Sequence, residues 1–125
     1  MDDTAPIYVY TRAQAIADGV LIDASETAHE AGFAIPVALT KALWDDIEAI
    51  PERYQGIQDV AGRLWDVLWM GYLAARTHPT TTDPLCYQVI MRVEGSRKSC
   101  YSIKMVIGPG DGGEPVLTLM KPEED

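Results

Sequence analysis

Hydrophobic residues recur at helical spacing over a long stretch in the middle of the chain, residues 59–76. Two series repeat every four residues, namely Leu64, Leu68 and Tyr72, and Trp65, Trp69 and Leu73. Two neighbouring series make a wide hydrophobic stripe, so the pattern predicts one long helix that is covered on more than one side. Both tryptophans are therefore expected to be largely buried. Asp59 is suited to cap the start of this helix, and Arg76 suits its negative C-terminal end.

The second half of the chain alternates between hydrophobic and polar residues, which is the period of β-strands. Residues 85–93 and 100–107 alternate in this way, and the polar segment EGSRKS between them predicts a β-hairpin that turns near Gly95. The segment 108–115 (GPGDGGEP) then leads to a last strand, residues 116–120. Three consecutive strands of this kind predict an antiparallel meander.

Shorter elements are predicted before the long helix. Strands or extended segments are expected at residues 6–10, 20–22 and 33–39, and helices are expected after caps at Thr11, Asp23 and Thr40. Asp23 and Glu26 have the spacing of a capping box, and Gly32 suits the end of that helix. Pro36 cannot donate a ladder hydrogen bond, so it confines its segment to a sheet edge or a turn.

At 125 residues, with 47% hydrophobic residues, the chain fits a single domain, 1–125, that can bury its own core. The fold class predicted is α+β, with an antiparallel C-terminal β-meander packed against a long Trp-rich helix and short N-terminal helices. Residues 121–125 are expected to form a flexible acidic tail. No hydrophobic run approaches the roughly 18 residues of a membrane helix, and no signal peptide is recognisable, so a cytoplasmic protein is expected.

The formal net charge is -9, and it is unevenly spread. Residues 1–62 carry 11 acidic residues against Arg12, Lys41 and Arg53, whereas residues 63–125 carry 8 acidic residues against 7 basic ones. Non-specific binding to nucleic acid or to an anionic membrane depends on a cationic surface. We therefore expect no direct binding to nucleic acid or membrane, and we expect a basic protein surface as the partner.

Six acidic residues are candidates for such a binding face: Asp45, Asp46 and Glu48 in one group, and Asp23, Glu26 and Glu30 in the other. The first group falls in the last turns of a predicted helix, where the macrodipole is already negative and only Lys41 is near. Glu26 and Glu30 stand at i and i+4, where like charges repel each other. Both placements cost free energy, which makes a functional face a hypothesis to test, although it is not the simpler interpretation. The alternative is an acidic surface that only keeps the protein soluble.

Neither a cofactor nor a metal is expected. The register of the predicted hairpin places Cys86 opposite residues 105–107 and not opposite Cys100, so two free thiols are expected. His29 and His78 are the only histidines, and neither has a cysteine or carboxylate at a metal-ligand spacing. No catalytic residue is therefore assigned.

Asp66 leaves room for a small enzyme. If the helix around it is covered on several sides, its carboxylate would be desolvated, and a raised pKa would suit general acid or base catalysis. An ion pair with Arg63 at i,i+3 is the simpler interpretation.

The glycine-rich segment 108–115 is an alternative ligand loop, through Gly110, Asp111 and Glu114. Its carboxylates disfavour phosphate, and its oxygen ligands are too few for a calcium loop. A turn that joins two strands is the simpler prediction.

Three blocks of the sequence, YTRAQAIADGVLIDAS, GRLWDVLWM and GPGDGGEPVLTLMKPEED, together resemble a family of small uncharacterised proteins found mainly on bacterial plasmids, integrative elements and phages. The resemblance implies a mobile-element setting and a domain of unknown function, and it transfers no catalytic residue. A shorter likeness, of YVYT followed by a helix and DGVL, to the opening of ADP-ribosyltransferase-like folds would favour an enzyme instead.

The function expected is therefore that of an acidic accessory protein of a mobile genetic element that acts by protein binding. One form would be inhibition of a nucleic-acid-binding protein of host defence, of the anti-CRISPR or anti-restriction type. The alternative is a small enzyme or ligand-binding domain with its site near Asp66 or the segment 108–115.

Overall fold

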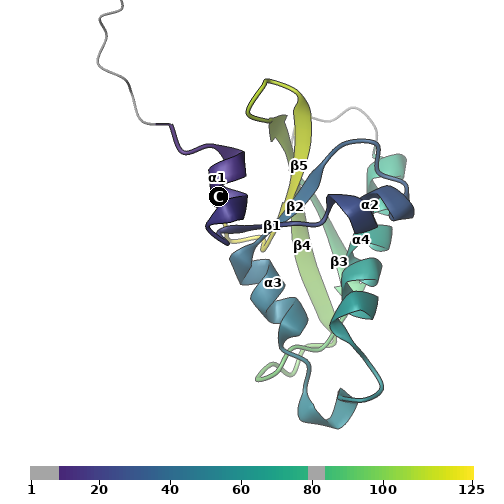
Figure 1. Cartoon of the computed structure of the whole chain (residues 1–125). Helices are drawn as coiled ribbons and strands as arrows, with labels where there is room; N and C mark the ends of the chain where they lie inside the picture. Colours follow the sequence, from purple (N-terminus) through teal and green to yellow (C-terminus); the bar gives the residue numbers. More distant parts are fainter. Residues whose placement is uncertain (1–8, 79–83) are drawn as a thin grey trace, which may run out of the picture.

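The computed structural model describes residues 9–78 and 84–125, which form an α+β fold as predicted. In chain order the elements are α1 (Arg12–Ala17), β1 (Leu21–Asp23), α2 (Ser25–Ala31), β2 (Val37–Thr40), α3 (Lys41–Glu48), the 3-10 helix η1 (Glu52–Tyr54), α4 (Val60–Thr77), β3 (Leu85–Ile90), β4 (Cys100–Pro109) and β5 (Pro115–Met120). The strands make one sheet in the order β1-β2-β5-β4-β3 (Figure 1). No helix within the described ranges has both the length and the hydrophobicity to cross a membrane.

The C-terminal strands form the predicted antiparallel meander. β4 pairs with β3 on one side and β5 on the other, so that Met105 stands opposite both Leu85 and Leu119. Gly95 lies in the connection between β3 and β4 with φ at +87°, a conformation that suits glycine because it has no Cβ.

β2 joins this meander through a parallel pairing with β5 that the sequence did not predict. Val37 stands opposite Leu117, and the Pro36 carbonyl accepts a hydrogen bond from the Leu117 N–H at 2.9 Å. β2 is thus an inner strand, so the edge position expected from Pro36 is wrong. Pro36 lies in the irregular segment directly before β2, so it removes no donor from the ladder.

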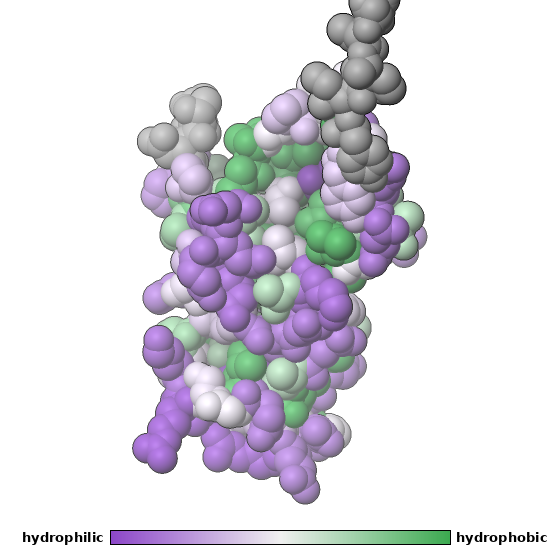
Figure 2. Space-filling model, turned by 90° about the vertical axis from the view of Figure 1, so that its left-hand side faces the viewer, coloured by the Kyte–Doolittle hydropathy of each residue, from purple (hydrophilic) through white to green (hydrophobic). Residues whose placement is uncertain are grey.

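The core lies between one face of the sheet and the helices α2, α3 and α4 (Figure 1). Its largest fully buried side chains are Leu39, Leu43, Ile47, Leu68, Ile103, Leu119, Val37 and Val67. α1 lies on the opposite face, where the Arg12 Nη1 donates to Thr118 Oγ1 at 2.8 Å. On the side of the molecule that carries α1 and α3 in Figure 1, hydrophobic groups lie in separate patches between hydrophilic ones, the larger patches being in the upper half (Figure 2).

Three helix starts follow the predicted caps. Thr11 and Gln14 exchange the reciprocal hydrogen bonds of a capping box at the start of α1. Thr40 accepts from the Leu43 N–H at α3, and Asp59 accepts from the Gly62 N–H at α4. Because these contacts join residues three apart, the sequence alone was sufficient to predict them.

The start of α2 differs from its prediction. The helix begins at Ser25 after Ala24, which makes no side-chain cap, and the Asp23 carboxylate accepts from the Ser25 N–H at 3.0 Å. The capping box of Asp23 with Glu26 is therefore absent. Gly32 ends α2 as predicted, with φ at +120°. The strand expected at residues 6–10 falls mostly outside the described residues, and Val9 and Tyr10 belong to no strand.

The last residues fold back onto the sheet and do not form the expected flexible tail. A Glu124 carboxylate oxygen accepts from the Thr40 hydroxyl at 2.7 Å and from the Lys121 N–H at 2.8 Å. The Glu124 carbonyl also accepts from the Lys104 ammonium group. Thr40 and Lys104 lie on two strands far away in sequence, so the composition of the tail could not indicate these two contacts.

Candidate functional site

Helix α4 is buried along one narrow side. Its buried residues are Arg63, Val67, Leu68 and Gly71. Gly71 allows a close approach to β3, since a Cβ at this position would lie 2.7 Å from the Tyr87 hydroxyl oxygen. That hydroxyl donates to the Val67 carbonyl at 2.8 Å. The contact joins α4 to the edge of the sheet.

The prediction that Trp65 and Trp69 are largely buried is wrong, because the two residues are 37% and 39% exposed. Met70 and Leu73 are exposed to a similar extent on the same helix. The sheet and α2 cover only the side of α4 that carries the buried residues. The wide stripe therefore combines one buried series with one that faces solvent.

The exposed series is ordered by ring stacking. The Trp65 and Trp69 rings are 6.2 Å apart and within 6° of parallel, and Trp69 lies 5.8 Å from Tyr72. We call Trp65, Trp69 and Tyr72 the aromatic row. The Arg76 guanidinium lies 5.7 Å from the Tyr72 ring centre, and Phe33 meets the same ring edge-on. The row is thus held in place by contacts within the protein.

Helix α2, which carries two of the predicted acidic residues, packs against α4. It does so through its buried Ala28 and Ala31, while Glu26 and Glu30 are exposed. Gly32 at the end of α2 lies so close to Tyr72 that a Cβ there would be 2.7 Å from the ring. The helix that carries Glu26 and Glu30 therefore meets α4 at Tyr72, the C-terminal ring of the aromatic row.

The other acidic group, on α3, is mostly engaged within the protein. Lys41 pairs with Asp45 at 2.8 Å. Asp46 accepts from the Tyr101 hydroxyl at 2.6 Å and lies 3.2 Å from the Lys121 ammonium nitrogen. Within the described residues Glu48 alone of this group has no hydrogen bond or ion pair.

Burial of the Tyr101 hydroxyl raises its pKa, and the hydrogen bond to Asp46 adds to this shift. The expectation that only Lys41 compensates the α3 acids missed Tyr101 and Lys121, which the fold brings from β4 and the C-terminal segment. Asp45, Asp46 and Glu48 lie on α3, whereas Glu26 and Glu30 lie on α2 and Asp23 ends β1, so the two groups are on different elements (Figure 1). Whether either group binds a partner stays a prediction.

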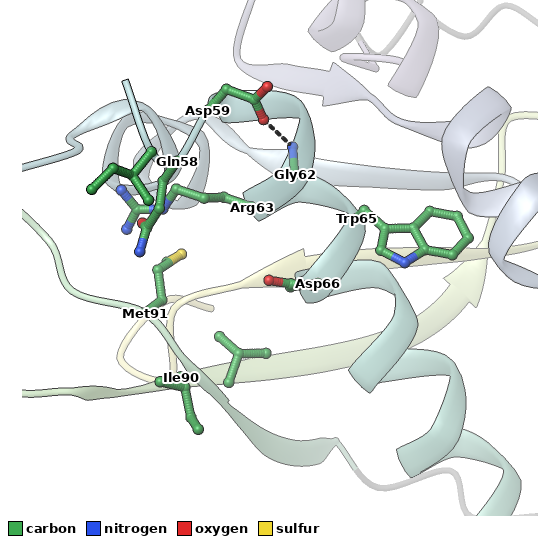
Figure 3. A pocket seen from close by; sticks show the side chains of 10 residues that line it. Gln58, Asp59, Gly62, Arg63, Trp65, Asp66, Ile90 and Met91 are labelled. Atoms are coloured by element: carbon green, nitrogen blue, oxygen red, sulfur yellow. Dashed lines mark hydrogen bonds between the residues drawn. The ribbon is translucent and has the colours of Figure 1, made fainter. Parts of the chain in front are cut away.

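A groove of about 420 Å³ lies between the start of α4 and the end of β3 (Figure 3). Ile57 and Gln58 line it from the loop before α4, and Ile90 and Met91 line it from the end of β3 and the residue after it. In Figure 3 the Asp66 side chain points from α4 toward Met91, whereas the Trp65 ring points away on the other side of the helix. The groove and the aromatic row are thus adjacent, because the consecutive residues Asp66 and Trp65 belong to one each.

Asp66 and Arg63 do not form the predicted ion pair. Asp66 is exposed, so it is not the desolvated carboxylate that an acid–base site would need, and it has no partner among the described residues. Arg63 is only 5% exposed and donates through Nη2 to the Arg92 carbonyl. Burial lowers the pKa of the Arg63 guanidinium, and Asp46 opposes this effect. The two side chains leave α4 in different directions, toward the core and toward solvent.

Two N–H groups of Arg63, at Nε and Nη1, are buried and have no acceptor within the described part of the chain. A buried donor without an acceptor costs free energy, of the order of 1–3 kcal/mol. This feature could not be recognised from the sequence, where Arg63 reads as an ordinary exposed helix residue.

The glycine-rich segment forms the turn that was predicted as the simpler interpretation. β4 and β5 pair up to Pro109 opposite Pro115. Glu114 accepts from the Gly112 N–H at 2.9 Å, and the Gly110 N–H donates to the Glu114 carbonyl. Asp111 accepts from backbone N–H groups at the start of α1. The candidate ligand oxygens thus hold the turn and a neighbouring helix together.

Both cysteines are exposed free thiols, as predicted. Cys86 stands opposite Lys104, one position away from the expected 105–107. His29 and His78 are exposed near the ends of α2 and α4. Across residues 9–78 and 84–125, no three side chains of His, Cys, Asp or Glu come together as metal ligands would.

The comparisons with known proteins identify a family and no relative of known activity. No curated protein and no solved structure matches the chain. A family model spans residues 1–125, the whole of the sequence. The chain therefore belongs to the family of unknown function DUF6573.

Proposed function

We propose that this protein acts by binding a basic protein through the aromatic row of α4 and the acidic residues of α2. The observation that carries the proposal is the exposure of Trp65 and Trp69 as a stacked pair on a protein of net charge -9. Contiguous exposed hydrophobic side chains mark interaction surfaces, and Trp and Tyr supply much of the binding energy in protein interfaces.

The chemistry of this surface suits arginine and lysine side chains. An aromatic face attracts a guanidinium or ammonium group, and Arg76 already lies over Tyr72 within the protein itself. The carboxylates of Glu26 and Glu30 supply the longer-range attraction that speeds encounter with a basic surface. A partner that presents arginines would gain from both effects.

A nucleic acid presents a similar combination to the proteins that bind it, namely negatively charged phosphates and flat bases that stack. In its narrower form the proposal is that the partner is a nucleic-acid-binding protein whose binding surface this protein occupies. Such an inhibitor would suit an accessory role for a mobile element, of the anti-CRISPR or anti-restriction type.

A pull-down from a bacterial lysate at low and high salt tests the proposal. The bait variant carries Trp65→Ser and Trp69→Ser, and its matched control carries Val20→Ser and Ile107→Ser, two exposed hydrophobic residues of other elements. We expect the wild type and the control to retain a basic protein at low salt, and the tryptophan variant to retain none. High salt should release the protein from every bait. Equal retention by both variants would contradict the proposal.

A further inference from the structure

β3 is an edge strand whose outer side has no partner strand within the described residues. The Met91 N–H donates to the Ser99 carbonyl at 2.9 Å, in register with the β3–β4 pairing. In an antiparallel ladder, alternate residues turn both their N–H and C=O toward the same neighbour. Cys86, Gln88 and Ile90 therefore direct their backbone groups outward.

This edge lacks the features that usually prevent strand addition. Natural edge strands carry charged residues, prolines or bulges that block further pairing. β3 reads LCYQVI, contains neither a charge nor a proline, and pairs in continuous register from Leu85 to Ile90. Ile90 at its end is 86% exposed. The backbone donors and acceptors are thus available to an incoming strand.

The groove beside α4 adds recognition for side chains of such a strand. Ile57 and Ile90, 81% and 86% exposed, offer hydrophobic contact on its two sides. Asp66 points into the groove with a carboxylate that has no partner in the described chain, and Asp59 lies at the same groove (Figure 3). This charge favours a cationic side chain and disfavours a second copy of a protein of net charge -9.

We infer that the outer edge of β3 accepts an extended segment of a partner protein as a sixth strand, with a lysine or arginine side chain of that segment on Asp66. The inference rests on the proposed function, since it describes how the same partner is held. Strand addition draws its affinity from main-chain hydrogen bonds and its specificity from pockets for alternate side chains. The outer edge of β3 supplies the main-chain hydrogen bonds, and the groove supplies a pocket for a side chain.

The buried Arg63 fits this arrangement. Arg63 lines the groove together with the exposed Ile57 and Gln58, and its Nε and Nη1 have no acceptor within the described residues. A segment that runs past Ile90 and displaces these side chains would bring a main-chain carbonyl to Arg63. Binding would then supply an acceptor that the described residues do not provide in the free protein.

The test uses two soluble synthetic peptides of alternating valine and threonine, one with a central lysine and one with norleucine in its place. Gln88→Pro removes an outward N–H and leaves the β3–β4 ladder intact, whereas the matched control Gln88→Thr keeps the N–H. We expect Gln88→Pro to weaken binding of the lysine peptide at least tenfold and Gln88→Thr to leave it unchanged. Asp66→Asn should reduce the affinity for the lysine peptide to that for the norleucine peptide.

Backbone amide NMR spectra of the wild-type protein keep the test independent of how well Gln88→Pro folds. The lysine peptide should shift the amide signals of Cys86, Gln88 and Ile90 more than those of β1. Absence of these shifts at the highest soluble peptide concentration, or equal binding by the two Gln88 variants, overturns the inference. If the lysate partner is lost on substitution of the tryptophans but kept by Gln88→Pro, the inference fails and the proposed function stands.

Discussion

The carboxylate of Asp111 accepts hydrogen bonds from two backbone N–H groups at the start of α1, those of Arg12 at 2.7 Å and Ala13 at 3.0 Å. The Arg12 guanidinium returns to the same hairpin, where it donates to the Leu117 carbonyl at 2.7 Å. A carboxylate at a helix N-terminus is favourable because it meets free N–H groups and the positive end of the dipole. The glycine-rich turn thus attaches the N-terminal helix to the meander.

Asp111→Ala should therefore lower the free energy of unfolding by about 1–2 kcal/mol, the usual cost of losing a helix cap. Asp66→Ala is the matched control, since Asp66 is exposed and has no partner among the described residues. Its effect should stay within about 0.5 kcal/mol. Urea denaturation of both variants measures the difference, and equal stabilities would contradict the structural role of Asp111.

The two hydrophobic series of α4 should respond differently to truncation. Leu68→Ala should cost about 2–5 kcal/mol, because Leu68 is fully buried. Trp69→Ala should cost less than about 1.5 kcal/mol, because the ring is partly exposed and loses mainly stacking. Thermal melting compares the variants. If Trp69→Ala proves as destabilising as Leu68→Ala, the aromatic row belongs to the core.

Stability should fall in alkaline solution. Burial raises the pKa of the Tyr87 and Tyr101 hydroxyls, so the folded protein keeps protons that an unfolded tyrosine loses above about pH 10. The contribution of each group is complete below about pH 10 and decreases by up to about 1.4 kcal/mol per pH unit above it. Urea denaturation between about pH 8 and pH 12 measures the slope. Tyr87→Phe should make the slope shallower, and an unchanged slope would count against Tyr87 as a source.

The acidic residues of α3 should separate into structural and free groups. Asp46→Asn should lower the free energy of unfolding by about 1–3 kcal/mol, since it weakens the contacts with Tyr101 and Lys121. Glu48→Gln should be neutral or slightly stabilising, because Glu48 lies near the negative end of the helix without a described partner. Chemical denaturation checks both variants. Slower association of Glu48→Gln with the isolated partner at low salt would assign this face to binding as well.

Both cysteines should react in the folded protein. Cys86 and Cys100 are exposed, so a thiol reagent should modify two groups without denaturant, at rates near those of the unfolded chain. A strand bound along β3 should slow the reaction of Cys86 more than that of Cys100. Reaction of only one group in the folded state would mean that one thiol is shielded.

The local elements of this fold could be predicted from the sequence, because their determinants lie a few residues apart. Thr11, Thr40 and Asp59 cap helices through contacts that span three residues. The alternation in β3, β4 and β5 reports which residues share a face, and EGSRKS marks the turn between the first two strands. The mixed α+β class and the meander follow from these patterns alone.

Only the tertiary structure decided which hydrophobic surface is covered and which charges are engaged. Periodicity showed that Trp65 and Leu68 are both hydrophobic positions of α4, but burial depends on whether a second layer lies above the helix. Asp46 and Asp111 likewise find partners more than 50 residues away along the chain, at separations of 55 and 99. Within the described residues, the groove, the unpaired outer edge of β3 and the unsatisfied N–H groups of Arg63 all arise from such distant contacts. A sequence pattern records the chemistry of each position, whereas the neighbours that act on it are set by the packing of the whole chain.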